Sequence, residues 1–104
     1  MAHALVNSDN LEKFIKNNIV PCVLKWGAKW CPPCRAAQPF IEKLAEKNPN
    51  INFVTIDVDK HRKIAREHNI SSIPRFDFYT SNGTLLNSVS GYDSGAIEDT
   101  VKKM

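Results

Sequence analysis

Cysteine is scarce in this chain, which has three among its 104 residues. Three thiols cannot all pair within one chain, and a disulfide framework needs several bridges, so the sequence does not describe a disulfide-stapled scaffold. Its 42% hydrophobic content is enough for a core that needs no staples. Low cysteine usage is typical of a reducing compartment. We therefore expect one cytoplasmic domain over residues 1–104.

Long apolar runs and a strong charge of one sign are also missing. No stretch approaches the roughly 20 apolar residues of a membrane span, and residues 1–5 lack the regions of a signal peptide. We expect no membrane partner and no export. The formal net charge of +3 names no partner. The basic residues 60–63 and Arg66 are diluted by nearby acids, so we expect a solvated helix face and no nucleic-acid site.

Hydrophobic periodicity predicts alternating strands and helices. A short first strand is expected to end at residues 5–6. Four further strands are expected at residues 19–27, 51–58, 76–80 and 85–89. Helices are expected from a cap at Ser8 or Asp9, and over residues 31–47, 60–68 and 96–104. Asn82-Gly83 separates the last two strands and is a strong hairpin signal. The order β-α-β-α-β-α-β-β-α predicts an α/β fold with a central mixed β-sheet flanked by helices.

Two of the cysteines fall in the segment Trp30-Cys31-Pro32-Pro33-Cys34, at the start of a predicted helix. Positions i and i+3 share a face of a helix, so these thiols can close into a disulfide with little backbone movement. The loop is so short that the bridge would add little stability. A cysteine pair that forms and breaks a disulfide easily, but adds little stability, indicates a role in redox exchange.

Two other interpretations of this pair are weaker. Inert core thiols would not need two prolines between them. A zinc site needs four ligands at suitable spacing. The other candidate ligands are Cys22, His3, His61 and His68, and none forms a second paired motif. We therefore expect no metal site, and Cys22 is interpreted as a small buried hydrophobe.

The two cysteines are predicted to have different roles. Cys31 stands at the helix N-terminus, where unpaired N–H groups and the helix dipole stabilise a thiolate, so it is the predicted nucleophile. Cys34 lies one turn further in, is expected to be more buried, and would resolve the mixed disulfide. Pro32 and Pro33 withhold two N–H donors from that turn. The cycle uses the redox-active pair itself and no bound cofactor.

The element order, with the cysteine pair at a strand-to-helix junction, resembles the thioredoxin family over nearly the whole chain. The matching features are Trp30-Cys31-x-Pro33-Cys34, Pro39, Ile73-Pro74, Asn82-Gly83 and Gly91. Pro32, where thioredoxins have Gly, and the following Arg35 are more similar to the tryparedoxin and nucleoredoxin branch. The chain lacks that branch's insertions and is as short as a thioredoxin.

The resemblance implies a docking surface around the cysteines. It implies a cis Pro74 against the thiols, with the Ile73 backbone pairing with a bound peptide like an added strand. Trp30 and Gly91 belong to the same implied surface. Arg75 stands where thioredoxins usually have Thr, and would add a positive charge at its rim. A merely solvated arginine is equally consistent with the sequence.

One central-strand position departs from the resemblance. Lys25 occupies the place of the family's buried Asp, and Thr55 the place of a lysine in the next strand. Burial would lower the pKa of Lys25, and a neutral amine could then accept a proton from Cys34. Alternatively, the lysine reaches solvent along its apolar stem.

The sequence thus predicts a monomeric thiol–disulfide oxidoreductase that reduces disulfides of protein substrates. An upstream reductase or a low-molecular-weight thiol would supply electrons. Two alternatives remain open: a redox-sensitive binding module with little turnover, and a tryparedoxin-like donor with its own low-molecular-weight thiol. Insulin reduction separates an enzyme from a binding module, because only the enzyme turns over.

Overall fold

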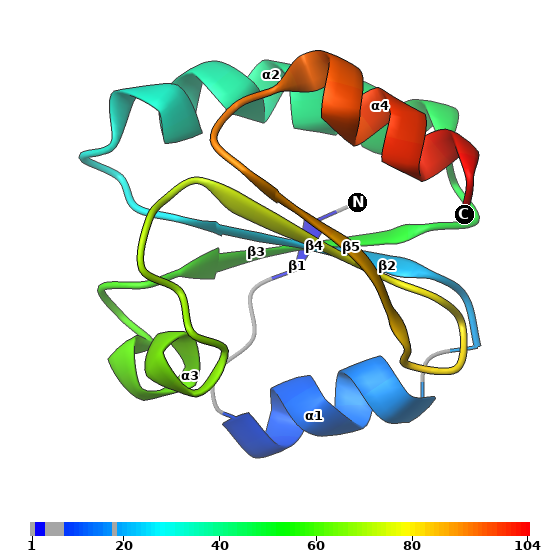
Figure 1. Cartoon of the computed structure of the whole chain (residues 1–104), viewed down its shortest axis with the longest axis horizontal. Coiled ribbons are helices and arrows are strands. Elements are labelled where there is room, and N and C mark those ends of the chain that lie inside the picture. The colour runs from blue at the N-terminus through cyan, green and yellow to red at the C-terminus, as the bar shows by residue number, and fades with distance from the viewer. Residues whose placement is uncertain (1, 4–7, 18) are drawn as a thin grey trace.

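The computed structural model describes residues 2–3, 8–17 and 19–104 (Figure 1). The strands are β1 (Ala2–His3), β2 (Cys22–Gly27), β3 (Asn52–Asp57), β4 (Arg75–Tyr79) and β5 (Leu85–Ser90). The helices are α1 (Ser8–Asn17), α2 (Pro32–Lys47), α3 (Arg62–Glu67) and α4 (Ser94–Lys102). This order is the predicted one. The predicted strand residues 5–6 lie outside the described part of the chain.

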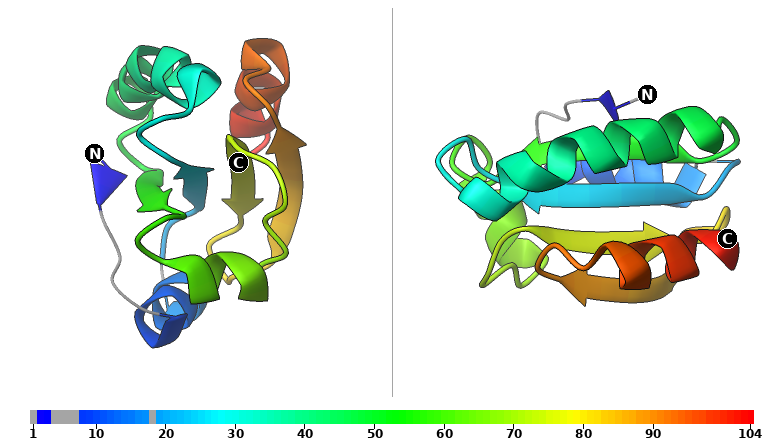
Figure 2. Two further views of the ribbon diagram at one scale, coloured as in Figure 1. Left: turned by 90° about the vertical axis from the view of Figure 1, so that its left-hand side faces the viewer. Right: turned by 90° about the horizontal axis from the view of Figure 1, so that it is seen from above.

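The strands form one mixed sheet in the order β1-β3-β2-β4-β5. Strands β1, β3 and β2 run parallel, and β4 and β5 add an antiparallel edge. Helices α2 and α4 cover one face and α1 and α3 the other (Figures 1 and 2). The predicted α/β fold, with a central mixed sheet flanked by helices, is confirmed.

Each face of the sheet has its own hydrophobic core. Successive side chains of a strand point to opposite faces, so each central strand contributes to both cores. The core under α2 and α4 includes Val23, Ala37, Ile41, Phe53, Phe76, Phe78, Ile97 and Val101. The core over α1 and α3 includes Leu11, Ile15, Leu24, Trp26, Val54, Ile56, Ile64 and Tyr79.

Strand β2 is shorter than predicted. It begins at Cys22, three residues after the expected start. Ile19 is 90% exposed and pairs with no strand. Pro21 has no N–H to give to a sheet ladder, so it marks the start of regular pairing. The apolar character of residues 19–21 was therefore misleading.

Two helices also begin earlier than the predictions. α4 starts at Ser94, two residues before the expected start, because Asp93 Oδ1 accepts the Ala96 N–H at 3.0 Å and caps the helix. α1 already includes Ser8 and Asp9, so neither is the residue before the helix. Within the described ranges, no helix is both long and apolar enough to cross a membrane.

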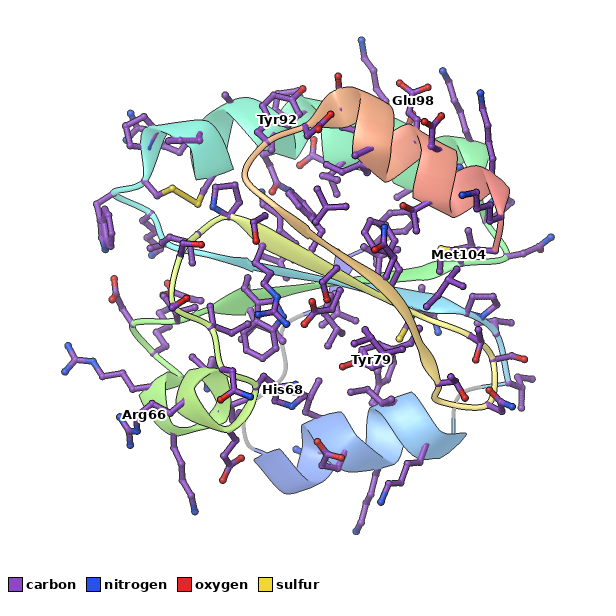
Figure 3. All side chains as sticks on the ribbon, viewed as in Figure 1. Arg66, His68, Tyr79, Tyr92, Glu98 and Met104 are labelled. Carbon is purple, nitrogen blue, oxygen red and sulfur yellow. A yellow bond between two sulfur atoms is a disulfide. The ribbon has the colours of Figure 1, made fainter. Side chains whose placement is uncertain are left out.

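The loops that follow β2 and β3 lie at the same edge of the sheet, where reactive groups are expected. β2 and β3 are parallel neighbours, so their carboxyl ends lie at the same edge of the sheet. Ligands and reactive groups gather at this edge in open α/β sheets. The loop after β2 ends at Cys31 and leads into α2, whose first turn carries Cys34; a disulfide joins the two residues (Figure 3).

Candidate active site at the start of helix α2

Cys31 and Cys34 form a disulfide across the first turn of α2 (Figure 3). Cys31 is the N-cap residue, with φ −88° and ψ 110°, and Pro32 and Pro33 fill the first two helical positions. The two Cα atoms are 5.2 Å apart. Because both prolines lack an N–H, the first-turn donor that reaches Cys31 Sγ is the Cys34 N–H, at 3.3 Å. The predicted helix start and cysteine geometry are confirmed.

The two sulfurs do not differ in burial as predicted. Both cysteines are 3% exposed in this oxidised form, so the expectation of a more buried Cys34 is wrong. Ala28 packs against the pair, and Val58 and Ile73 lie over it from the neighbouring loops. Because these loops pack over the disulfide, Cys31 is buried as deeply as Cys34. The spacing of residues in the sequence does not indicate where these loops lie.

The loop before β4 faces the disulfide. The Ile73–Pro74 peptide bond is cis, as the resemblance implies. Cys31 Sγ lies 3.9 Å from the carbonyl oxygen of Ile73. Gly91 donates its N–H to the Pro74 carbonyl oxygen at 2.8 Å and has a φ of 82°, a conformation that glycine adopts without steric strain. Ile73, Pro74 and Gly91 are therefore brought together beside Cys31.

The two tryptophans differ in their surroundings. Trp26 is fully buried in the core over α1 and α3. Trp30, directly before Cys31, is 65% exposed, and its Nε1–H donates to Asp59 Oδ2 at 2.6 Å. This bond ties the indole of the β2–α2 loop to the loop after β3. An exposed and oriented aromatic ring beside a reactive pair is suited to contact a partner.

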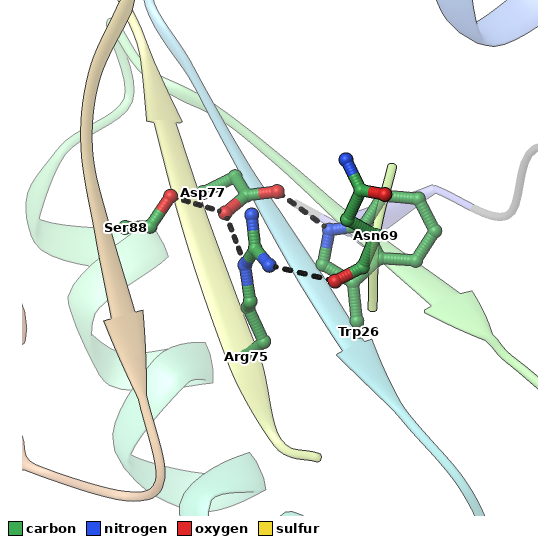
Figure 4. A network of polar contacts seen from close by, with 5 residues as sticks. All are labelled: Trp26, Asn69, Arg75, Asp77 and Ser88. Carbon is green, nitrogen blue, oxygen red and sulfur yellow. Dashed lines mark hydrogen bonds and ion pairs between the residues drawn. The ribbon is translucent and has the colours of Figure 1, made fainter. Parts of the chain in front are cut away.

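Arg75 belongs to a polar network within the sheet rather than to an open rim (Figure 4). Its Nε donates to Asp77 Oδ1 at 2.9 Å, and its Nη1 donates to the Asn69 carbonyl oxygen at 3.2 Å. Asp77 also accepts from Trp26 Nε1 at 3.0 Å and from Ser88 Oγ at 2.7 Å. Asp77 pairs with the guanidinium, so the positive charge that the sequence suggested for the rim is balanced by a neighbouring carboxylate, and the arginine is not merely solvated.

Lys25 is buried in the middle of β2, opposite Thr55 of β3 and only 4% exposed. Its Nζ donates to the carbonyl oxygen of Cys34 at 3.0 Å and to Gln38 Oε1. Burial lowers the pKa of Lys25 below the ordinary 10.5, and the carboxylate of Glu42 opposes that shift in part. Lys25 therefore does not snorkel, and its amine contacts the backbone of Cys34.

Three residues around this site were not identified from the sequence. Asp77 stands two residues after Arg75, a spacing that places both on one face of a strand, so an ion pair could have been expected. Gln38 meets Lys25 only through the packing of α2 on β2, which no local pattern indicates. Gly27 has no side chain, and a Cβ there would lie 3.2 Å from Cys34 Sγ, so a larger residue would press on the disulfide.

Of the other candidate zinc ligands considered above, the structure describes the side chains of Cys22, His61 and His68. No cluster of three or more His, Cys, Asp or Glu side chains that could hold a metal ion occurs among the described residues. Cys22 is buried in the core over α1 and α3. His68 lies near Trp26, with ring centroids 5.1 Å apart, and its Nε2 is 3.3 Å from Glu12 Oε1.

Comparison with known proteins agrees with this geometry. The family model for thioredoxin matches residues 2–103. A thioredoxin from Aspergillus fumigatus is 38% identical over 84 residues, which are 81% of this chain and 78% of that protein. An H-type thioredoxin from Ricinus communis is 36% identical over 78% of this chain and 68% of its own length.

Solved structures give the same result. The oxidised mitochondrial thioredoxin 3 of Saccharomyces cerevisiae superposes with a TM-score of 0.92 at 31% identity, covering 99% of this chain and 95% of its own. Reduced Schistosoma mansoni thioredoxin has a TM-score of 0.87 at 35% identity, covering 98% and 96%. A binding module without turnover is not favoured by these relatives. The chain belongs to the thioredoxin family, and with its Cys31–Cys34 pair it is a thiol–disulfide oxidoreductase.

Proposed function

We propose that this protein reduces disulfides in protein substrates, with Cys31 as the nucleophile and Cys34 as the resolving thiol. The observation that carries the proposal is the position of Cys31: it caps α2, accepts the Cys34 N–H, and faces the Ile73 carbonyl oxygen. A sulfur held at a helix N-terminus, beside a backbone that can pair with a peptide, is suited to attack an extended peptide docked there.

The reaction proceeds in two exchanges. The Cys31 thiolate attacks one sulfur of the substrate disulfide, forms a mixed disulfide, and releases the other substrate sulfur as a thiolate. Cys34, deprotonated, then attacks Cys31 Sγ, which closes the Cys31–Cys34 disulfide and releases the second substrate thiolate. Two electrons have moved from the pair to the substrate. An upstream reductase or a low-molecular-weight thiol returns them, and no bound cofactor is needed.

The docking surface consists of residues around Cys31. The backbone of Ile73, beside Pro74, pairs with the substrate chain, and Gly91 supports it through its bond to the Pro74 carbonyl. The exposed ring of Trp30 covers part of the substrate. Arg75 acts indirectly, because its side chain holds the Asn69 backbone in the segment that leads to Ile73. Two positions, Ile73 and Trp30, therefore make the main contacts.

Lys25 is proposed to accept the Cys34 proton when the mixed disulfide is resolved. The buried amine bonds to the Cys34 carbonyl, and its lowered pKa makes a neutral amine more accessible than in water. Its two acceptors fix the amine beside the first turn of α2. The proton reaches Lys25 after the disulfide opens and Cys34 Sγ is free to move.

Trapping tests the two cysteine roles. Cys31→Ser should abolish dithiothreitol-driven insulin reduction, whereas Cys34→Ser should accumulate mixed disulfides with insulin chains that are visible on non-reducing gels. Cys22→Ser is the matched control and should keep full activity, since Cys22 lies outside the disulfide. Trapping by Cys31→Ser instead of Cys34→Ser would reverse the roles, and an inactive Cys22→Ser would contradict the two-cysteine cycle.

The cellular location and the oligomeric state are proposed from composition and surface character. The scarcity of cysteine supports a reducing, cytoplasmic location. Beyond Trp30, the large apolar side chains exposed on the described surface are Ile19, Leu85, Leu86 and Tyr92, and so small a number supports a monomer. Fractionation of the native source and sedimentation of the purified chain test these two points.

A further inference from the structure

A pocket of about 490 Å³ opens beside Cys34, at the shared carboxyl edge of β2 and β3. Its described lining includes Cys34 but not Cys31, Ile73 or Pro74, so it is distinct from the proposed substrate-docking surface. Pockets of a few hundred Å³ are the size that small molecules occupy. Docking of the protein substrate, as proposed above, does not use this space, although Lys25 and Cys34 of the lining take part in the proposed resolving step.

Gly27 belongs to the pocket lining, next to Cys34 and the stem of Lys25. A Cβ on Gly27 would come within 3.2 Å of Cys34 Sγ and within 4.0 Å of Lys25 Cε. The φ angle of Gly27 lies outside the left-handed region, so the backbone conformation does not require glycine at this position. A side chain at position 27 would therefore press on Cys34 and take up part of the pocket between Cys34 and the stem of Lys25.

The lining is strongly cationic. The described lining holds four cations, Lys25, Lys29, Arg35 and Lys60, and one carboxylate, Asp57, which together give a formal charge of +3. That equals the net charge of the whole chain. The cations come from four segments: β2, the β2–α2 loop, the start of α2 and the loop after β3. Cations from separate segments that converge on one concave site concentrate positive potential there.

Lys25 adds a directed donor to this potential. An ammonium group has three N–H bonds. Lys25 gives two of them to protein acceptors, the Cys34 carbonyl oxygen and Gln38 Oε1. Among the residues that the structure describes, no acceptor takes the third. A bound anion would supply one, and would offset the desolvation of this buried amine.

We propose that this pocket is a binding site for a small multivalent anion carrying phosphate or carboxylate groups. The anion contacts Lys25 at the base, and Lys29, Arg35 and Lys60 at the mouth. Charge-assisted hydrogen bonds to phosphate or carboxylate oxygens are the chemistry that these side chains share. The site adjoins Cys34 without covering Cys31, so substrate and anion can be bound together.

The experiment is a titration of the oxidised, isotope-labelled protein with sodium pyrophosphate in one arm and citrate in the other, at constant ionic strength. Backbone amide signals of Gly27, Ala28 and His61 report binding at the pocket. We expect saturable shifts of these signals, and the tighter arm shows whether phosphate or carboxylate is preferred. No turnover is involved, so this result is independent of whether the protein reduces insulin.

A charge-matched pair of variants locates the site. Lys60→Glu reverses a charge of the pocket mouth, and Lys63→Glu reverses an equally exposed charge three residues later, outside the lining. We expect Lys60→Glu to weaken binding about tenfold and Lys63→Glu less than about twofold. Equal effects of the two variants, or no saturable shift up to about 20 mM of either anion, would overturn the proposal.

Discussion

Lys25 Nζ donates a 3.0 Å hydrogen bond to the carbonyl oxygen of Cys34, which joins the middle of a central strand to the first turn of α2. The amine is enclosed by β2, β3 and α2, with Gln38 Oε1 as its second acceptor. Gln38 Nε2 in turn donates to Glu42 Oε2 at 3.1 Å. The charged form of Lys25 is therefore partly supported by neighbours, but burial remains the larger effect on its pKa.

Replacing Lys25 with methionine should stabilise the protein at neutral pH. The pKa of Lys25 is lowered in the fold, so folding disfavours the protonated amine, and this penalty is fully present below the folded pKa. The penalty disappears as pH rises towards the unfolded value of 10.5. Urea denaturation at several pH values measures this effect. We expect the unfolding free energy of Lys25→Met to exceed that of wild type at neutral pH, and the difference to shrink as pH rises towards 10.5.

The same variant tests the proposed proton acceptor. Loss of the amine should slow resolution of the mixed disulfide more than the first attack, and should change the pH–rate profile in stopped flow. Lys25→Asp, which restores an acid–base group at this position, should recover part of the resolving rate. Unchanged resolution in Lys25→Met would show that the Cys34 proton leaves by another route.

Asp77 should be essential for stability although it lies away from the disulfide. It is 1% exposed and accepts hydrogen bonds from Trp26, Arg75 and Ser88. Asp77→Ala leaves Arg75 Nε and the Trp26 indole N–H without their acceptor, at a cost of about 3–5 kcal/mol. Asp93→Ala removes only a helix cap and should cost about 1 kcal/mol. Equal losses in denaturant titrations of the two variants would refute the central role of Asp77.

Local sequence patterns were sufficient for the element order and the cysteine motif. Alternating apolar segments, the Asn82-Gly83 turn and the Cys-x-x-Cys spacing each reflect short-range physics. The failures involve contacts between distant segments. The burial of Cys31 depends on Ile73 in another loop, and the contact of Lys25 with Gln38 depends on the packing of α2 on β2. The pocket beside Cys34 exists only where β2, β3 and α2 meet.

Tyr79 should ionise late in an alkaline titration. Burial, and then the carboxylate of Asp77, raise the pKa of Tyr79 from 10.0 to about 12. Folding favours the neutral phenol, so its contribution to stability is complete below pH 10.0 and is lost as pH rises towards 12. The difference in phenolate absorbance between wild type and Tyr79→Phe reports the ionisation of Tyr79. This difference should therefore appear only near the upper end of that pH range. A difference signal already complete at pH 10.0 would contradict the buried phenol.

Pro32 should limit how well the first turn of α2 supports a Cys31 thiolate. Pro32 and Pro33 occupy the first two helical positions, and the Cys34 N–H is the first-turn donor on Cys31 Sγ. Pro32→Gly returns one N–H to this turn, and the added donor should stabilise the thiolate. Alkylation of the reduced protein by iodoacetamide should then stay fast to a lower pH than in wild type.

A second proline of the same helix provides the control for this effect. Pro39→Gly also adds an N–H to α2, but in the helix interior, away from the Cys31 end. It should leave the pH dependence of alkylation unchanged. Pro32→Gly should also lower the unfolding free energy by about 0.4–1 kcal/mol, because glycine gives the unfolded chain more freedom than proline. If both variants shift the alkylation profile equally, helix flexibility rather than the restored donor is responsible, and the first turn does not act on Cys31 as argued.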